Sequence, residues 1–167
     1  MSTVHLHLLL NHVPVIGTLI ALLLLAYAAL RRDDGLARVS LAMFAILAIV
    51  ALATFLTGEP AEEAVEELAG ISERAIETHE EAALLSTIAL GVVGALSLGT
   101  LLWFRRRALP NAAAVALLFL ALVPAGTMAW TANLGGQIRH SEIRPVPSLE
   151  MDLAADPAPT DGDGEHE

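Results

Sequence analysis

Five histidines could carry chemistry in this chain, and each lies in or beside a predicted membrane-spanning segment. Three fall in the opening stretch HLHLLLNHVPVIG, one precedes the third apolar block, and one follows the fourth. They are His5, His7, His12, His79 and His140. Histidine is the most common metal ligand among side chains, and polar groups at membrane depth are candidates for function. We therefore expect a site at the membrane boundary.

Three interpretations of these histidines compete. The first is a b-type haem held by an imidazole pair, with His7 or His12 on one side and His79 or His140 on the other. The second is a mononuclear or dinuclear metal site, in which imidazoles alone suit Cu or Zn and imidazoles with carboxylates suit Zn, Fe or Mn. The third is a set of interfacial imidazoles that only hydrogen-bond their neighbours. The candidate metal ligands are His7, His12, His79, His140, Glu81 and Glu142, with Glu59, Glu63 and Glu80 nearby.

The spacing of the histidines restricts their pairing. If the first and third spans are continuous helices, His7 lies 24 residues before Arg31 and His79 lies 26 residues before Arg105. At 1.5 Å per residue, the depths of the two histidines then differ by about 3 Å. His12 is five residues beyond His7 and points roughly 140° away from it. His7 and His79 could then face each other across the bundle, and the spacing leaves the pairing of the histidines open.

Two further features limit the arrangement of the first histidines. His5 and His12 share one helix face, and haems on both would be only about 10 Å apart, which argues against a haem on each. Pro14 removes a backbone hydrogen bond and disfavours a helical Val13. If the first helix starts at Pro14, residues 5–12 form an outer cap and the depth match between His7 and His79 is lost.

Four apolar blocks must position these side chains. The chain has 167 residues, 55% of them hydrophobic, and a mean hydropathy of +0.62. The blocks contain no Asp, Glu, Lys or Arg, whereas a soluble helix would show a charged stripe. Each is long enough to cross roughly 30 Å of hydrocarbon. They cover residues 8–30, 39–57, 82–104 and 111–132.

The blocks predict an all-α integral membrane four-helix bundle over residues 1–144, followed by an acidic disordered tail over residues 145–167. The tail contains His166, which we expect to be inert. The chain has no cysteine. Disulfides, iron–sulfur clusters and covalently attached haem are therefore excluded.

The arginines predict the orientation of the bundle. Six of the nine basic residues lie in the two short connections, at positions 31, 32 and 38 and at positions 105–107, although the net charge of the chain is −10. The positive-inside rule assigns these connections to the cytoplasm. Both termini and the histidines then lie on the periplasmic side of a bacterial inner membrane.

The long outer connection, residues 57–83, holds nine acidic residues and one basic residue. Its less polar residues recur at spacings of three and four, which predicts a short amphipathic helix between the second and third spans. They are Val65, Leu68, Ser72, Ile76 and His79. This helix either runs into the third span or is followed by a new start with a capping box of Thr78 and Glu81. Gly135 and Gly136 are expected to end the fourth helix.

The segments LHLLLNHVPVIG, TGEPAEE, HEEA and GGQIRHSEIR together resemble a family of small bacterial four-helix membrane proteins, known mainly as a domain of unknown function. The family pattern has two histidines and a proline in helix one, a histidine before helix three and a double glycine after helix four. These fall on His7, His12, Pro14, His79, Gly135 and Gly136. Val13 and the acidic outer connection depart from the pattern, which indicates a separate branch. The resemblance supports the four helices and the outer histidines and implies no reaction.

The expected function is that of a membrane-bound electron-transfer subunit that binds haem b, or a Zn, Cu or Fe ion, through its outer histidines. The alternative is a structural or accessory subunit of a larger membrane complex without a cofactor. A redox or accessory subunit is expected rather than a stand-alone enzyme. The expected partners are the lipid bilayer and a redox partner or larger complex, and no nucleic-acid patch appears. The acidic connection is either a solvated face or a dock for a basic partner such as a periplasmic cytochrome.

Overall fold

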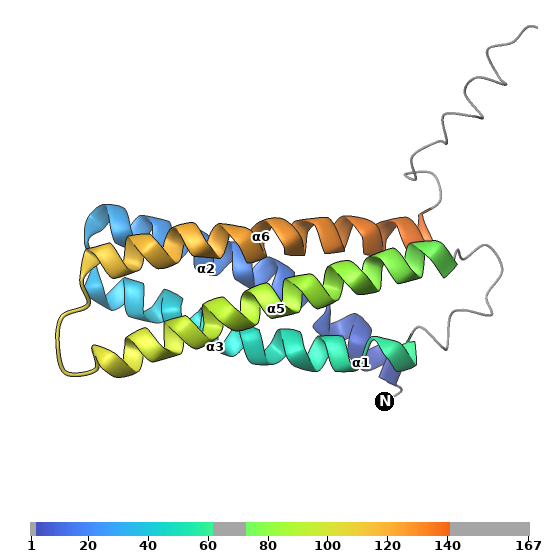
Figure 1. Cartoon of the computed structure of the whole chain (residues 1–167), viewed down its shortest axis with the longest axis horizontal. Helices are drawn as coiled ribbons and strands as arrows, with labels where there is room; N and C mark the ends of the chain where they lie inside the picture. Colours follow the sequence, from blue (N-terminus) through green and yellow to red (C-terminus); the bar gives the residue numbers. More distant parts are fainter. Residues whose placement is uncertain (1–2, 62–72, 141–167) are drawn as a thin grey trace, which may run out of the picture.

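The computed structural model describes residues 3–61 and 73–140, which are almost entirely helical and contain no strand (Figure 1). The helices are α1 (Thr3–Leu10), α2 (His12–Arg31), α3 (Asp34–Leu56), α5 (Glu73–Trp103) and α6 (Asn111–Arg139). This confirms the predicted all-α four-helix bundle. The tail, Glu142 and most of the predicted outer amphipathic helix lie outside the described residues.

Four helices are long and apolar enough to cross a membrane, namely Val4–Arg31, Asp34–Leu56, Glu73–Trp103 and Asn111–Ile138. Their outward faces carry many large apolar side chains, and Leu23, Ile49 and Phe119 are each more than 60% exposed. A surface that faced water would not be covered with such residues. The outer faces of the bundle are therefore suited to lipid.

The four long helices pack in a ring in which α2 adjoins α3, α3 adjoins α5, α5 adjoins α6, and α6 returns to α2. The approach of α5 to α3 is close at Gly94, where an added Cβ would lie 2.5 Å from the Cβ of Ala48 and 3.0 Å from the carbonyl oxygen of Phe44. Small residues allow such contacts between helices in lipid, where no hydrophobic force draws helices together.

The two halves of the bundle repeat one pattern of burial. Buried residues of α3 and α6 recur at intervals of three and four along each helix, which is the spacing of a helix face in a bundle. In α3 they include Ala37, Ser40, Phe44, Leu47, Ala51 and Thr54, and in α6 they include Ala114, Leu117, Ala121, Pro124, Met128 and Thr131. Likewise Pro14, Thr18, Ala21 and Leu25 of α2 match Ser86, Leu90, Val93 and Ser97 of α5. The bundle thus consists of two similar helical hairpins.

The first span is broken near its start. α1 ends at Leu10, and α2 begins at His12. Pro14 explains the break, because it has no N–H to donate to the carbonyl of Leu10 and its ring crowds that carbonyl. The second part begins at His12, two residues before Pro14, so the helix does not start at Pro14. The interruption is confined to Asn11, whose backbone is α-helical and whose N–H donates to the His7 carbonyl at 2.9 Å. Figure 1 shows α1 crossing to lie beside the end of α3.

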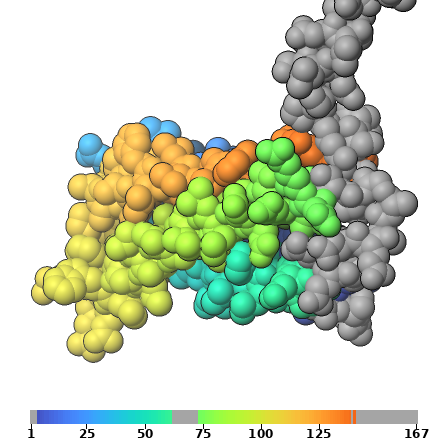
Figure 2. Space-filling view, turned by 45° about the vertical axis from the view of Figure 1, so that its right-hand side comes forward, coloured from blue at the N-terminus to red at the C-terminus, as the bar shows by residue number. Residues whose placement is uncertain are grey.

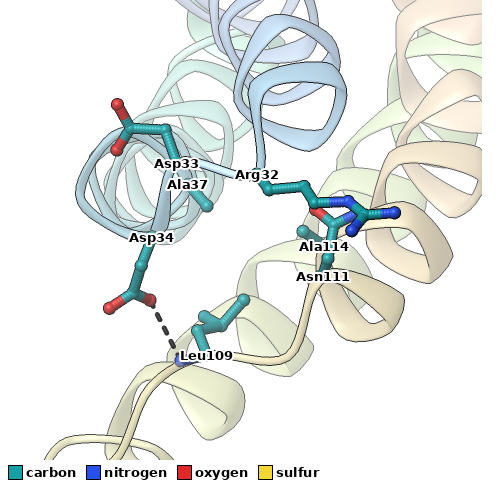
Figure 3. Close-up of a pocket in the computed structure, with 7 residues that line it drawn as sticks. All are labelled: Arg32, Asp33, Asp34, Ala37, Leu109, Asn111 and Ala114. Atoms are coloured by element: carbon teal, nitrogen blue, oxygen red, sulfur yellow. Dashed lines mark hydrogen bonds between the residues drawn. The ribbon is translucent and has the colours of Figure 1, made fainter.

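At the opposite end of the bundle, one acid–base pair joins α3 to the connection between α5 and α6. The Asp34 carboxylate accepts hydrogen bonds from Arg38 Nε at 3.1 Å and from the backbone N–H of Leu109 at 3.0 Å (Figure 3). Arg38 Nη2 donates to the carbonyl oxygens of Phe104 at 3.1 Å and Arg107 at 2.7 Å. These bonds satisfy backbone groups that the connection leaves without helical partners.

Two expectations for the histidine end are corrected. No capping box forms at Thr78, because α5 already runs through it from Glu73 and its hydroxyl donates to the carbonyl of Arg74 at 2.7 Å. The outer connection therefore does run into the third helix. Gly135 and Gly136 do not end α6, which continues to Arg139. The glycines remain helical there, and Gly135 serves instead as a contact surface for His79.

The Asp34 contacts predict a measurable stability difference. Asp34→Ala should lower the free energy of unfolding by about 1 kcal/mol, because a partly exposed carboxylate that accepts charged and backbone donors is lost. Denaturation in mixed micelles, followed by circular dichroism, measures this. Asp33→Asn is the matched control and should have almost no effect, because Asp33 only accepts the N-cap bond from Leu36 N and Asn caps equally well. Equal stability of Asp34→Ala and the unmodified protein would contradict the role of Asp34.

Candidate functional site

His7 lies against the end of α3. Its Nδ1 is 3.1 Å from the carbonyl oxygen of Thr54 and 3.3 Å from Thr57 Oγ1. The Thr57 hydroxyl gives its own proton to the same Thr54 carbonyl at 2.8 Å. Both partners of Nδ1 therefore act as acceptors, and Nδ1 carries the proton.

His79 lies near the start of α5 and packs against the end of α6. Its Nδ1 is 3.0 Å from the carbonyl oxygen of Thr131, which can only accept, so this Nδ1 is also protonated. A Cβ added at Gly135 would lie 3.0 Å from His79 Cε1 and 3.3 Å from Nδ1. The ring is thus held between a carbonyl and a helical glycine.

Two hydroxyl groups form hydrogen bonds deeper in the bundle than His79. Thr131 donates its proton to the carbonyl of Thr127 at 2.9 Å, so the 2.8 Å contact between Ser86 Oγ and Thr131 Oγ1 is a bond that Ser86 donates. Ser86 and Thr131 are both buried. The bond joins α5 to α6 about two turns deeper than His79 and helps to fix the backbone carbonyl that orients the imidazole.

The two histidine contacts are equivalent in the two hairpins. Thr54 and Thr131 are matched positions in the buried stripes, and the backbone oxygen of each accepts a hydrogen bond from an imidazole of the preceding span. Each threonine is followed four residues later by a glycine at the imidazole, because Gly58 lies beside His7 as Gly135 lies beside His79. Both imidazoles therefore lie at the same end of the core.

The arrangement defines the chemistry that the two rings can offer. A neutral imidazole that donates through Nδ1 keeps a lone pair on Nε2, and a bond from Nδ1 to a backbone carbonyl is the usual way in which a ligating histidine is oriented. The pair can therefore present two Nε2 ligands at one end of the bundle.

The remaining candidate residues do not join this pair in a metal-binding group. Within residues 3–61 and 73–140, no three or more His, Asp or Glu side chains come together in a way that could hold a metal ion. His5, His12 and Glu81 are exposed, and His140 is an exposed residue that follows the last turn of α6. Glu63 and Glu142 lie outside the described residues. A metal site built from His12, His140 and Glu81 thus gains no support.

Sequence reasoning found His7 and His79 but missed the groups that hold them. Thr54 and Thr131 act through their backbone carbonyls, and nothing about a threonine side chain predicts that role. A signal was nevertheless present, because the motif Thr-x-x-x-Gly occurs in TFLTG, residues 54–58, and again in TANLG, residues 131–135. Its recurrence at the ends of the second and fourth spans marks the two equivalent contacts.

Comparison with protein-family models, with curated proteins and with solved structures finds no match to this chain. The resemblance to a family known as a domain of unknown function stays a prediction. The site is therefore argued from its own residues.

The contact between Gly135 and His79 predicts a specific steric effect. Gly135→Ala should lower the free energy of unfolding by about 1–3 kcal/mol relative to Gly126→Ala, because the new methyl group overlaps the ring. Gly126 is the matched control, since it lies in the same helix and an added Cβ meets nothing within 4 Å. Thermal unfolding in detergent measures the difference.

A double substitution isolates this contact. In a His79→Ala background the ring is gone, so Gly135→Ala and Gly126→Ala should then have equal effects on stability. If Gly135→Ala keeps its excess cost without the imidazole, the ring is not the group it meets.

Proposed function

We propose that this protein is a membrane-bound electron-transfer subunit that holds a b-type haem between His7 and His79. The observation that carries the proposal is the pair of equivalent Nδ1–H to carbonyl hydrogen bonds, at 3.1 Å to Thr54 and 3.0 Å to Thr131. Each bond selects the tautomer whose Nε2 can ligate iron. Two such imidazoles, one from each hairpin, are the protein ligands that a six-coordinate haem requires.

The donor set favours haem over a bare metal ion. A structural or catalytic zinc site takes three or four protein ligands, whereas an axially ligated haem takes two and obtains four nitrogens from its own macrocycle. The described residues hold one imidazole of each hairpin at the same end of the bundle, and they contain no group of three potential metal ligands. On sequence alone, His12 and His140 are candidate ligands equal to His7 and His79. Both are exposed in the structure, which makes them weaker candidates.

The residues of the chain have defined tasks in this proposal. His7 and His79 would supply the axial nitrogens, and the Thr54 and Thr131 carbonyls would hold the rings and increase their basicity as ligands. When bound, the haem supplies one-electron oxidation and reduction. Because both rings lie at one end of the bundle, electrons would be exchanged with a partner on that side of the membrane.

A cofactor-free structural or accessory subunit is the second candidate, and a specific observation favours it. The same two imidazoles join helices, since His7 ties α1 to α3 and His79 ties α5 to α6. A protein that needed only to close the end of its bundle could use these bonds alone.

The visible spectrum of the purified protein separates the two candidates. A haem protein should show a Soret band with α and β bands that sharpen on reduction. His7→Ala and His79→Ala should each remove these bands, because each deletes an axial ligand, while the exposed His12→Ala should keep them. The protein should also be expressed with added haem and then purified. If it shows no Soret band, the haem proposal is wrong and the accessory role is left.

We also propose that both termini and the two histidines face the periplasm of a bacterial inner membrane. The support is the charge asymmetry, since Arg31, Arg32, Arg38 and residues 105–107 all lie at the end opposite His7 and His79. Alkaline phosphatase fused after residue 140 should be active, and the same reporter fused after Arg107 should be inactive. Activity in the reverse order would overturn this orientation.

A further inference from the structure

The connection between α5 and α6 carries three consecutive arginines, and none of them forms an ion pair with an acidic side chain of residues 3–61 or 73–140. Arg105, Arg106 and Arg107 are exposed. In the part of the chain that the structure describes, the ion pair present joins Arg38 to Asp34. In Figure 2 the end of the molecule that holds this connection, coloured yellow, projects from the bundle. These guanidinium groups are therefore available to a ligand.

The backbone beneath these arginines is held in place. Arg38, from α3, donates to the carbonyls of Phe104 and Arg107. The Arg107 N–H donates back to the Phe104 carbonyl at 3.1 Å, which closes a turn, and Asp34 accepts from Leu109 N at 3.0 Å. A loop fixed at both ends presents its side chains with less loss of conformational entropy on binding than a free loop.

The three arginines surround a hollow together with an aromatic residue. A surface hollow of about 300 Å³ is lined by Trp103, Arg105, Arg106 and Arg107. Trp103 ends an apolar helix and is 76% exposed, as is usual for an indole at the surface of a bilayer. Leu102 beside it is also exposed, so apolar surface adjoins the cationic hollow.

We propose that this hollow binds the phosphate group of an anionic phospholipid, with the acyl chains along the apolar surface of α5. Guanidinium groups donate paired hydrogen bonds that match phosphate oxygens. Basic residues that flank a membrane helix attract anionic headgroups. Orientation by the positive-inside rule requires only charge in a short connection, and neither the hollow nor the fixed backbone would be needed for it.

Retention of lipid by the purified full-length protein tests the proposal. In native mass spectrometry from detergent, phosphatidylglycerol should bind well above phosphatidylcholine. Arg105→Gln, Arg106→Gln and Arg107→Gln should each weaken phosphatidylglycerol binding about fivefold, the effect of one basic residue at a membrane surface. Circular dichroism should be unchanged, because the three side chains are exposed and make no ion pair with described residues.

A control at the same end of the bundle separates a site from diffuse charge. Arg31→Gln removes an exposed arginine from the other short connection, away from the hollow, and should leave phosphatidylglycerol binding within about twofold of the unmodified protein. Equal losses for Arg31→Gln and Arg106→Gln would overturn the proposal, as would equal binding of the two lipids. Displacement of the lipid by inorganic phosphate at matched concentration would also overturn it, because the ligand would then be a soluble anion.

Discussion

The absence of water in the hydrocarbon core of a bilayer is the constraint on which the rest of this structure depends. Every peptide group within a span has to be satisfied by the chain itself, which leaves the helix as the form available to a segment without strand partners. Several polar side chains inside the bundle follow the same rule, whereas the buried hydroxyls of Thr18 and Ser97 have no hydrogen-bond partner among the described residues. Ser40 donates to the carbonyl of Ala21, Thr54 to that of Val50 and Thr131 to that of Thr127. Ionisable groups with defined partners are left to the two ends.

The two ends use ionisable groups in different ways. At one end, Asp34 and Arg38 bond to the backbone of the α5–α6 connection and hold it against α3. At the other end, His7 and His79 bond to carbonyls of the neighbouring helix. The Asp34 carboxylate and the Arg38 guanidinium are bonded to each other. An imidazole that donates a hydrogen bond through Nδ1 still has a lone pair on Nε2. The histidine end therefore retains imidazole lone pairs, and the opposite end retains the exposed cations of Arg105, Arg106 and Arg107.

The repeat of one hairpin explains why two imidazoles arrive together. A single hairpin can place one histidine against the carbonyl of its second helix and one glycine beside the ring. Two such hairpins packed in a ring bring two of these units to the same end, at Thr54 with Gly58 and at Thr131 with Gly135. Each histidine, carbonyl and glycine unit is formed within one hairpin and needs no residue from the other hairpin. The presence of two equivalently bonded imidazoles at one end is thus a consequence of how the hairpins associate.

The sequence by itself determined the helices, their number and the end at which the histidines gather. The length of an apolar segment and the positions of its flanking charges can be taken from the sequence alone, because neither depends on which helices pack beside that segment. Helix ends were less predictable, since Gly135 and Gly136, which often stop a helix, lie inside α6.

Only the tertiary structure decided which of the candidate histidines are partly buried and which backbone carbonyls bind them. His7, His12, His79 and His140 were equal candidates until packing buried parts of His7 and His79 and left His12 and His140 exposed. The partners are backbone carbonyls of Thr54 and Thr131, 47 and 52 residues away in the chain. Every residue has such a carbonyl, so residue type cannot mark the one that an imidazole will meet. Helix packing selects it, because packing alone sets which carbonyl lies within hydrogen-bond reach.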